Sequence, residues 1–237
     1  KGFEYKSNVQ PQYCVDTNLL HLSTEGGRLE NIGVEFDESD VFQWTQFEPC
    51  REETKLSFEF KNGLPIKMNG QSFLSHELLE ELNQIGGKHG IGVVDLVEER
   101  ANGIKSRGIY ETPGGTILSH AIKQLKQICW SRKLSRTAQM LSQEYGQLIY
   151  DGDWHSLARN SIEAFFVEAG QSLSGEVDLL LKGARIQVLK RESQWSLYNP
   201  NAVSFESDQS NFNEASKGYT QFVTHPSRLE GRVRSQQ

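Results

Sequence analysis

The chain has 237 residues, of which 36% are hydrophobic and 24% charged, so it can build a sizeable core and is not of the disordered class. Its formal net charge of −6 provides no overall positive field to attract nucleic acid. No apolar run approaches the roughly 20 residues that a membrane-spanning helix needs, so we expect neither nucleic acid nor a membrane as a partner.

The cysteine and histidine patterns give no sign of a metal centre. Cys14, Cys50 and Cys129 are widely separated and form no C-x-x-C pair, which argues against a disulfide framework or a thiolate zinc site. The six histidines are scattered, and none lies in an H-E-x-x-H motif. We therefore expect no metal-binding residues, and a cytoplasmic protein. The chain begins with Lys1 rather than Met and carries no signal-peptide pattern, so we expect it to start inside a longer protein.

The N-terminal part of the chain is loop-rich up to about residue 55. A short apolar segment in Asn18–Leu29 runs into two glycines, and the acidic stretch Glu35–Asp40 predicts a solvated loop. In Lys55–Met68, apolar and polar residues alternate before Asn62-Gly63, which is a favourable turn sequence. This pattern predicts a β-hairpin.

A helix is predicted from Ser75, which can cap its N-terminus, and Gly86 suits the left-handed position that ends many helices. The apolar face of this helix, spaced by three or four residues, consists of Leu78, Leu79, Leu82 and Ile85. The apolar run Gly90–Val97 then indicates a strand.

The second half of the chain is mainly helical and ends in further strands. Apolar spacing predicts helical structure from Thr116 to Tyr150 and another helix from Ser156 to about Leu173. Gly175–Arg191 predicts a second hairpin that turns at Lys182-Gly183. Because strands and helices come in blocks without regular βαβ alternation, the sequence predicts an α+β fold with antiparallel sheets and packed helices.

Self-contained catalytic motifs are absent from the sequence. No G-x-G-x-x-G, G-x-x-x-x-G-K-[ST] or G-x-S-x-G pattern occurs. The double glycines in Glu25–Gly27, Ile85–Gly87 and Pro113–Gly115 are most simply turns or helix caps. Pro113–Gly115 opens a helix whose N–H groups could also face an anion. We therefore assign no catalytic residue.

Polar side chains gather where short apolar segments end. They are Ser23, Glu25, Glu98, Glu99, Arg107 and Tyr110. A glutamate can bind an ammonium group, and hydroxyl or N–H donors can bind a carboxylate, so this set suits an amino-acid ligand. A glutamate at a strand end is also often simply solvated.

A long block of the sequence resembles a known enzyme family. GKHGIGVVDLVEERANGIKSRGIYETPGGTILSHA (Gly87–Ala121) is similar to the most characteristic block of the argininosuccinate synthases. Val15–Glu30, Leu148–Ser156 and Lys190–Asn199 resemble further blocks of that family in the same order. The resemblance covers nearly the whole chain and implies that KSRGIYETPGG (Lys105–Gly115) belongs to an amino-acid site.

The resemblance implies a ligase that condenses citrulline with aspartate. In this family ATP, with Mg²⁺ expected, activates citrulline, and AMP and pyrophosphate leave. The family's phosphate-binding S-G-G-x-D-[ST] loop lies in an N-terminal nucleotide-binding domain, and this sequence contains no SGG. The sequence thus resembles only the C-terminal half, whose partner domain would lie in the full chain or in a separate subunit. We expect the isolated chain to be inactive.

Position by position, the resemblance implies four citrulline-binding residues. Ser23, Glu98 and Tyr110 match family contacts, and the fourth falls on Cys14, where the family has a serine. Ser119 is a second departure, because the family usually has tyrosine there.

The resemblance also implies a domain division and an assembly. We expect a citrulline-binding synthetase domain over residues 1–217 and a C-terminal oligomerisation arm over residues 218–237 in a homotetramer. The alternative is a non-catalytic oligomerisation or ligand-binding module derived from the same domain, which the missing loop and the changes at Cys14 and Ser119 would favour.

Overall fold

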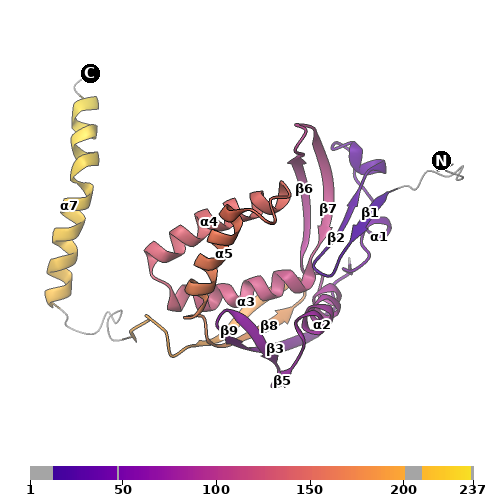
Figure 1. Ribbon diagram of the computed structural model, residues 1–237, viewed down its shortest axis with the longest axis horizontal. Helices are drawn as coiled ribbons and strands as arrows, with labels where there is room; N and C mark the ends of the chain where they lie inside the picture. The colour runs from indigo at the N-terminus through magenta and orange to yellow at the C-terminus, as the bar shows by residue number, and fades with distance from the viewer. Residues whose placement is uncertain (1–12, 47, 201–209, 236–237) are drawn as a thin grey trace, which may run out of the picture. The chain divides into compact units, whose positions relative to one another are not determined.

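The computed structural model describes residues 13–46, 48–200 and 210–235 (Figure 1). The chain divides into two compact units, residues 1–197 and 198–237, and each is described here by itself. The first unit contains two antiparallel sheets with packed helices, so the predicted α+β fold is confirmed.

The larger sheet has five strands in the order β5-β4-β3-β8-β9. The strands are β3 (Glu53–Lys61), β4 (Leu64–Met68), β5 (Gln71–Ser72), β8 (Gly175–Lys182) and β9 (Arg185–Glu192). Both predicted hairpins are confirmed. Their turns contain Asn62, Gly63 and Gly183 with φ of 52°, 83° and 53°, a region that asparagine and glycine tolerate.

The main core lies between this sheet and two helices, α2 (Ser75–Lys88) and α3 (Pro113–Cys129), which run beside it in Figure 1. Alternate residues of the central strands point inward and are at most 3% exposed. These inward residues are Leu56, Phe58 and Phe60 on β3 and Val177, Leu179 and Leu181 on β8.

Two details of the first predicted helix are wrong. Ser75 is the first helical residue rather than the cap, and the Glu77 carboxylate accepts the backbone N–H of Leu74 instead (3.1 Å). Gly86 lies inside α2 and is buried. A Cβ at this position would be only 2.8 Å from Pro113 Cβ of α3. Gly86 therefore allows two helices to approach closely and does not end the first.

The helical stretch predicted from Thr116 to Tyr150 is two helices. α3 already begins at Pro113, and α4 (Arg132–Tyr150) starts anew after Ser131, whose hydroxyl accepts the N–H of Leu134 (3.3 Å). The helix predicted from Ser156 to about Leu173 is α5 (Leu157–Gly170), and Ser156 is its cap.

The smaller sheet has four strands in the order β1-β2-β7-β6. They are β1 (Cys14–Thr17), β2 (Leu22–Glu25), β7 (Lys105–Glu111) and β6 (Val93–Glu99). The 3₁₀ helix η1 (Gly27–Glu30) and the short helix α1 (Glu38–Val41) contribute to a small core on one face. The buried members of this core are Leu29, Val41 and Ile109.

The acidic stretch Glu35–Asp40 is mostly exposed, but it is not a simple loop. Its last three residues form the start of α1, because the Asp37 carboxylate accepts the N–H of Ser39 (2.9 Å). A capping aspartate in a short acidic run therefore produces a helical turn.

A fully buried carboxylate fixes the C-terminal end of β7. Glu111 is 0% exposed, and its two oxygens accept the backbone N–H groups of Gln43, Trp44 and Thr45 at 2.9, 2.8 and 2.6 Å. These contacts attach the segment after α1 to the smaller sheet.

The second unit contains α7 (Ser210–Arg234), with Pro226 inside it. The arm expected from residue 218 thus lies within a longer helix. The described helices include none with the length and apolarity needed to cross a membrane.

We predict that Glu111→Gln lowers the free energy of unfolding by about 1–3 kcal/mol, because the buried amide offers one oxygen to three backbone N–H donors. Chemical denaturation measures this change. Glu81→Gln, a change at an exposed position, is the control and is expected to alter stability by less than about 0.5 kcal/mol. Equal effects of the two substitutions would contradict the role of Glu111.

Candidate functional site

The four residues assigned to citrulline share one face of the smaller sheet. Ser23 of β2 lies opposite Tyr110 of β7, and Cys14 of β1 lies opposite Glu25 of β2. Glu98 of β6 is four residues from the position opposite Tyr110. Because side chains two residues apart on a strand point the same way, all of them face away from the small core around Ile109.

Tyr110 and Glu98 are in direct contact. The phenol donates a hydrogen bond to Glu98 Oε1 at 2.5 Å. On the neighbouring strand, the residue opposite Glu98 is Ser106, which is four residues from Tyr110. Four residues span about 13 Å of a strand. The side chain of Tyr110 must therefore extend along β7 to reach Glu98. Gly108 makes room for it, since a Cβ there would be only 3.0 Å from Tyr110 Cε2.

A second polar group borders this pair. Arg100, just after β6, forms an ion pair with Glu25 and donates from Nε to Ser106 Oγ at 2.9 Å. Together with Cys14, these three residues line part of a concave region of about 540 Å³ at the end of β2. Val97 and Arg107 of the opposite face also line this region, and Ser23, Glu98 and Tyr110 do not. The face therefore offers a cation, carboxylates and hydroxyls within one area.

The electrostatics keep the Tyr110 phenol neutral. Burial raises its pKa above the ordinary value, and the hydrogen bond to Glu98 and the negative charge of Glu98 raise it further. The phenol is thus a hydrogen-bond donor at physiological pH. It uses only part of the acceptor capacity of the Glu98 carboxylate, and an ammonium group could bind the rest.

The turn before β2 is fixed to the helices by Asn83 and Thr112. Asn83 donates to the carbonyl of Leu19 (2.9 Å) and accepts the N–H of Gly114 (2.9 Å), and Thr112 donates to the carbonyl of Leu20 (3.0 Å). A Cβ on Gly114 would be 2.8 Å from Asn83 Oδ1. In Pro113–Gly115, the Gly114 N–H thus binds a side chain, and this glycine serves close packing.

Two residues that stood out in the sequence lie away from this face. Arg107 points to the opposite face, where it binds Asp95 through two hydrogen bonds (2.9 and 2.6 Å) and lowers the pKa of that carboxyl. Ser119 is exposed on α3. Within the described residues no group of three or more His, Cys, Asp or Glu could hold a metal ion.

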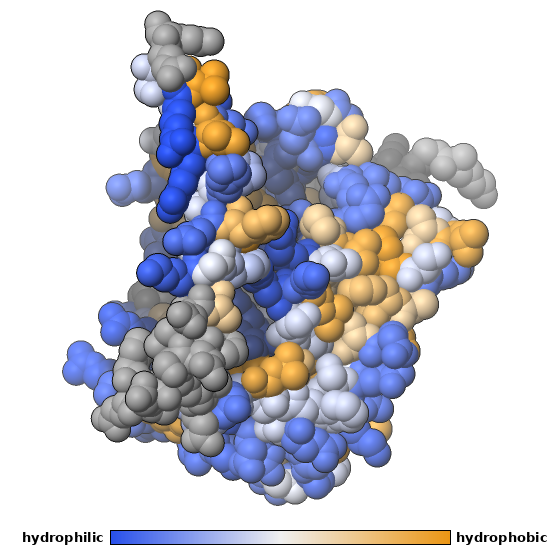
Figure 2. All heavy atoms as spheres, turned by 90° about the vertical axis from the view of Figure 1, so that its left-hand side faces the viewer, coloured by the Kyte–Doolittle hydropathy of each residue, from blue (hydrophilic) through white to orange (hydrophobic). Residues whose placement is uncertain are grey.

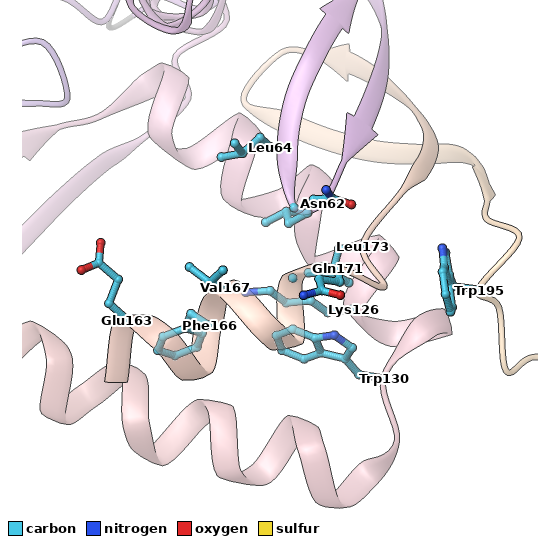
Figure 3. Close-up of a pocket in the computed structure, with 13 residues that line it drawn as sticks. Asn62, Leu64, Lys126, Trp130, Glu163, Phe166, Val167, Gln171, Leu173 and Trp195 are labelled. Atoms are coloured by element: carbon cyan, nitrogen blue, oxygen red, sulfur yellow. The ribbon is translucent and has the colours of Figure 1, made fainter. Parts of the chain in front are cut away.

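A larger cavity of about 770 Å³ lies elsewhere, between α3, α5 and the β3–β4 turn (Figure 3). Trp130, Phe166 and Val167 make much of its wall apolar. Lys126 lies 5.1 Å from the centre of the Trp130 ring, and burial lowers its pKa. This cavity contains none of the four residues assigned to citrulline.

Comparison with known proteins places the chain in a family. Residues 13–229 match the model of the arginosuccinate synthase C-terminal domain. The chain belongs to the argininosuccinate synthase family.

Argininosuccinate synthases from several bacteria are similar to it. That of Methylobacillus flagellatus is 42% identical over 87% of this chain and 51% of its own length. That of Polynucleobacter necessarius is 41% identical over 87% of this chain and 50% of its own length. That of Clostridium kluyveri is 33% identical over 98% of this chain and 58% of its own length. The chain thus spans about half the length of the curated relatives it matches.

We predict that Tyr110 titrates above the ordinary tyrosine range and that Glu98→Gln lowers its pKa by removing a negative charge. Because the pKa of Tyr110 is higher in the folded than in the unfolded chain, the neutral phenol contributes to the free energy of unfolding. This contribution is complete below about pH 10, the pKa of tyrosine in the unfolded chain, and is lost as the pH rises through the pKa of the folded state. NMR of ring-labelled tyrosine, with Tyr110→Phe to assign the signal, measures the titration.

Glu99→Gln is the matched control for this titration, because Glu99 is the next residue on β6, faces the other way and pairs with Lys105 (3.3 Å). A Tyr110 signal that titrates at the ordinary tyrosine pKa would contradict the contact with Glu98.

Proposed function

We propose that the chain is the citrulline-binding half of an argininosuccinate synthase, the ligase that joins citrulline to aspartate and converts ATP to AMP and pyrophosphate. The observation that carries this proposal is the shared face of Ser23, Glu98 and Tyr110 in a chain of this family. These residues come from three strands and are separated by up to 87 positions, so their convergence is a property of the fold.

The proposed roles follow from the chemistry of each group. Glu98 binds the α-ammonium group of citrulline, Tyr110 adds a polar contact beside it, and Ser23 donates to an oxygen of the ligand. Cys14 takes the fourth position, where its thiol is a weaker donor than a hydroxyl.

The remaining substrates belong to the other half of the enzyme. We assign ATP, its Mg²⁺ and most contacts to aspartate to the nucleotide-binding domain, because the sequence contains no S-G-G-x-D-[ST] loop. The 237-residue chain alone is therefore expected to release no pyrophosphate. The three cysteines, all in the described part of the chain, are unpaired, in keeping with the proposed cytoplasmic location.

The second candidate is a ligand-binding or oligomerisation module without ligase activity. The thiol of Cys14 at an assigned citrulline contact favours it, since the thiol would weaken the hold on the ligand. Restoring Cys14→Ser distinguishes the two, because a ligase gains citrulline affinity from this change and a module of other function does not.

We predict that Glu98→Gln weakens citrulline binding by about 1.5–3 kcal/mol, the value of a lost charge-assisted hydrogen bond. The assay is citrulline-dependent pyrophosphate release by the chain combined with an argininosuccinate synthase nucleotide-binding half. Glu99→Gln, on the opposite face, is the control and should leave the citrulline KM unchanged. A Glu98→Gln enzyme with the wild-type KM would remove Glu98 from the site.

We also propose a homo-oligomer, a tetramer, in which α7 contacts another subunit. Within α7, the apolar residues Tyr219, Phe222, Val223, Leu229 and Val233 are each at least 47% exposed. Figure 2 shows apolar areas between hydrophilic ones on one face of the molecule. Arg228, Arg232 and Arg234 give the end of the helix a positive charge suited to an acidic surface.

Removal of residues 218–237 is expected to reduce the oligomer to a smaller species, because it deletes the apolar anchors of α7. Light scattering on the chain with and without these residues measures the mass. A monomer in both samples would refute the assembly, and an unchanged oligomer would place its interface elsewhere.

A further inference from the structure

The cavity between α3, α5 and the β3–β4 turn has a size and a lining that suit a small molecule (Figure 3). Its volume of about 770 Å³ lies within the range of about 300–1,000 Å³ that small-molecule sites occupy. Three of its side chains are aromatic, namely Trp130, Phe166 and Trp195. Leu64, Val167 and Trp195, which also line it, are 68%, 65% and 51% exposed. Exposed apolar side chains gathered around one hollow indicate a surface that a ligand covers.

The inner aromatic walls of this cavity are held in place by the fold. Trp130 is 7% exposed, and its Nε1–H donates to the carbonyl of Ala169 at 3.1 Å. The ring of Phe166 packs edge-to-face on Phe165 and on Tyr145, with ring centres 5.3 and 6.3 Å apart. A ligand that packs against these rings therefore does not have to order them first.

Trp195 belongs to a segment that is attached to the rest of the unit at two points. Its backbone N–H donates to Ser193 Oγ at 3.0 Å, and the N–H of Leu197 donates to the carbonyl of Ile128 of α3 at 2.7 Å. The Ser193 hydroxyl in turn donates to the carbonyl of Ser174 at 2.6 Å. The half-exposed indole ring therefore stays beside the cavity, as Figure 3 shows.

Lys126 is the only cationic side chain among the described residues that line the cavity. Its Nζ lies 5.1 Å from the centre of the Trp130 ring, and no carboxylate of the described residues forms an ion pair with it. Glu163, the one carboxylate in the lining, pairs with Arg159 instead (3.0 Å). Burial alone lowers the pKa of Lys126, so its ammonium group is partly removed from water without a counter-charge. A bound anion would supply that counter-charge.

We propose that this cavity binds an aromatic monocarboxylate, whose ring packs among the aromatic walls and whose carboxylate pairs with Lys126. One unpaired cation matches one negative charge, and aromatic walls offer a ligand ring stacked or edge-to-face contacts. None of the four residues assigned to citrulline lines this cavity, so the inference does not depend on the proposed function.

The test measures two affinities of the full chain by isothermal titration calorimetry at neutral pH. One ligand is naphthoate, and the other is naphthylmethanol, which has the same ring and a neutral alcohol in place of the carboxylate. We expect naphthoate to bind at least about tenfold more tightly, the equivalent of one charge-assisted hydrogen bond. This comparison needs no variant.

Two variants then locate the charge that the ligand recognises. Lys126→Met removes the ammonium group and keeps an unbranched side chain, so it should weaken naphthoate binding at least about tenfold and leave the naphthylmethanol affinity within about twofold. Lys123→Met is the matched control, because Lys123 is exposed on the same helix and lines the neighbouring smaller cavity instead. It should leave both affinities within about twofold, since water screens an exposed charge. Circular dichroism checks that both variants fold.

Three results would overturn the inference. Equal affinities of the wild-type chain for naphthoate and naphthylmethanol would show that the cavity does not recognise a negative charge. A loss of naphthoate affinity in Lys126→Met no larger than that in Lys123→Met would show that Lys126 does not hold the carboxylate. Absence of saturable naphthoate binding up to millimolar concentrations would show that the cavity is no site for such a ligand.

Discussion

The buried carboxylate of Glu111 determines which way the strand of the candidate site faces. Burying a charge is costly unless hydrogen bonds compensate it, and three backbone N–H groups do so here. Because side chains alternate along β7, fixing Glu111 toward the inner face places Tyr110 on the outer one. A slip of one residue would bury the phenol and expose the carboxylate, so the same contact secures both the core and the site.

Close approaches at glycines then shape the surroundings. Gly87 lies against the carbonyl of Trp44, where a Cβ would be 2.1 Å from the oxygen, so this glycine lets the segment bound by Glu111 approach α2. The N–H of Gln46 then donates to the carbonyl of Gly87 (2.9 Å). Gly114 lets Asn83 reach the N-terminus of α3, and Gly108 lets the Tyr110 ring reach Glu98. The sequence alone favours turns and caps for the double glycines, but Gly86 and Gly114 are sites of close packing.

Local patterns predicted those elements that local chemistry decides. Alternation and Asn62-Gly63 predicted the first hairpin, and Ser156 marked the start of α5. The break between α3 and α4 was missed because apolar spacing continues across it, and only the Ser131 cap reveals it. Arg107 was grouped with the site since the sequence does not show that it faces Asp95.

Long-range contacts explain what the sequence could not show at the site. Arg100 and Glu25 are 75 residues apart, and Gly114 and Asn83 are 31 apart, so neither pair forms a local motif. The resemblance supplied the four assigned residues, and the strand register explains how they share a face. Register is a tertiary property, which no periodicity in a single strand contains.

The exposed part of this face indicates what a second domain that covers it would add. Val94 and Leu96 lie on the same face as Tyr110 and Glu98, and they are 46% and 42% exposed. In water, the polar contacts beside them are screened and contribute little to holding a ligand. A second domain that covers the face would remove the two apolar side chains from water, and the lower local dielectric would strengthen every charge-assisted hydrogen bond to the ligand. The same burial would therefore stabilise the assembly of the two domains and, in the proposed function, strengthen the pairing of the Glu98 carboxylate with an ammonium group.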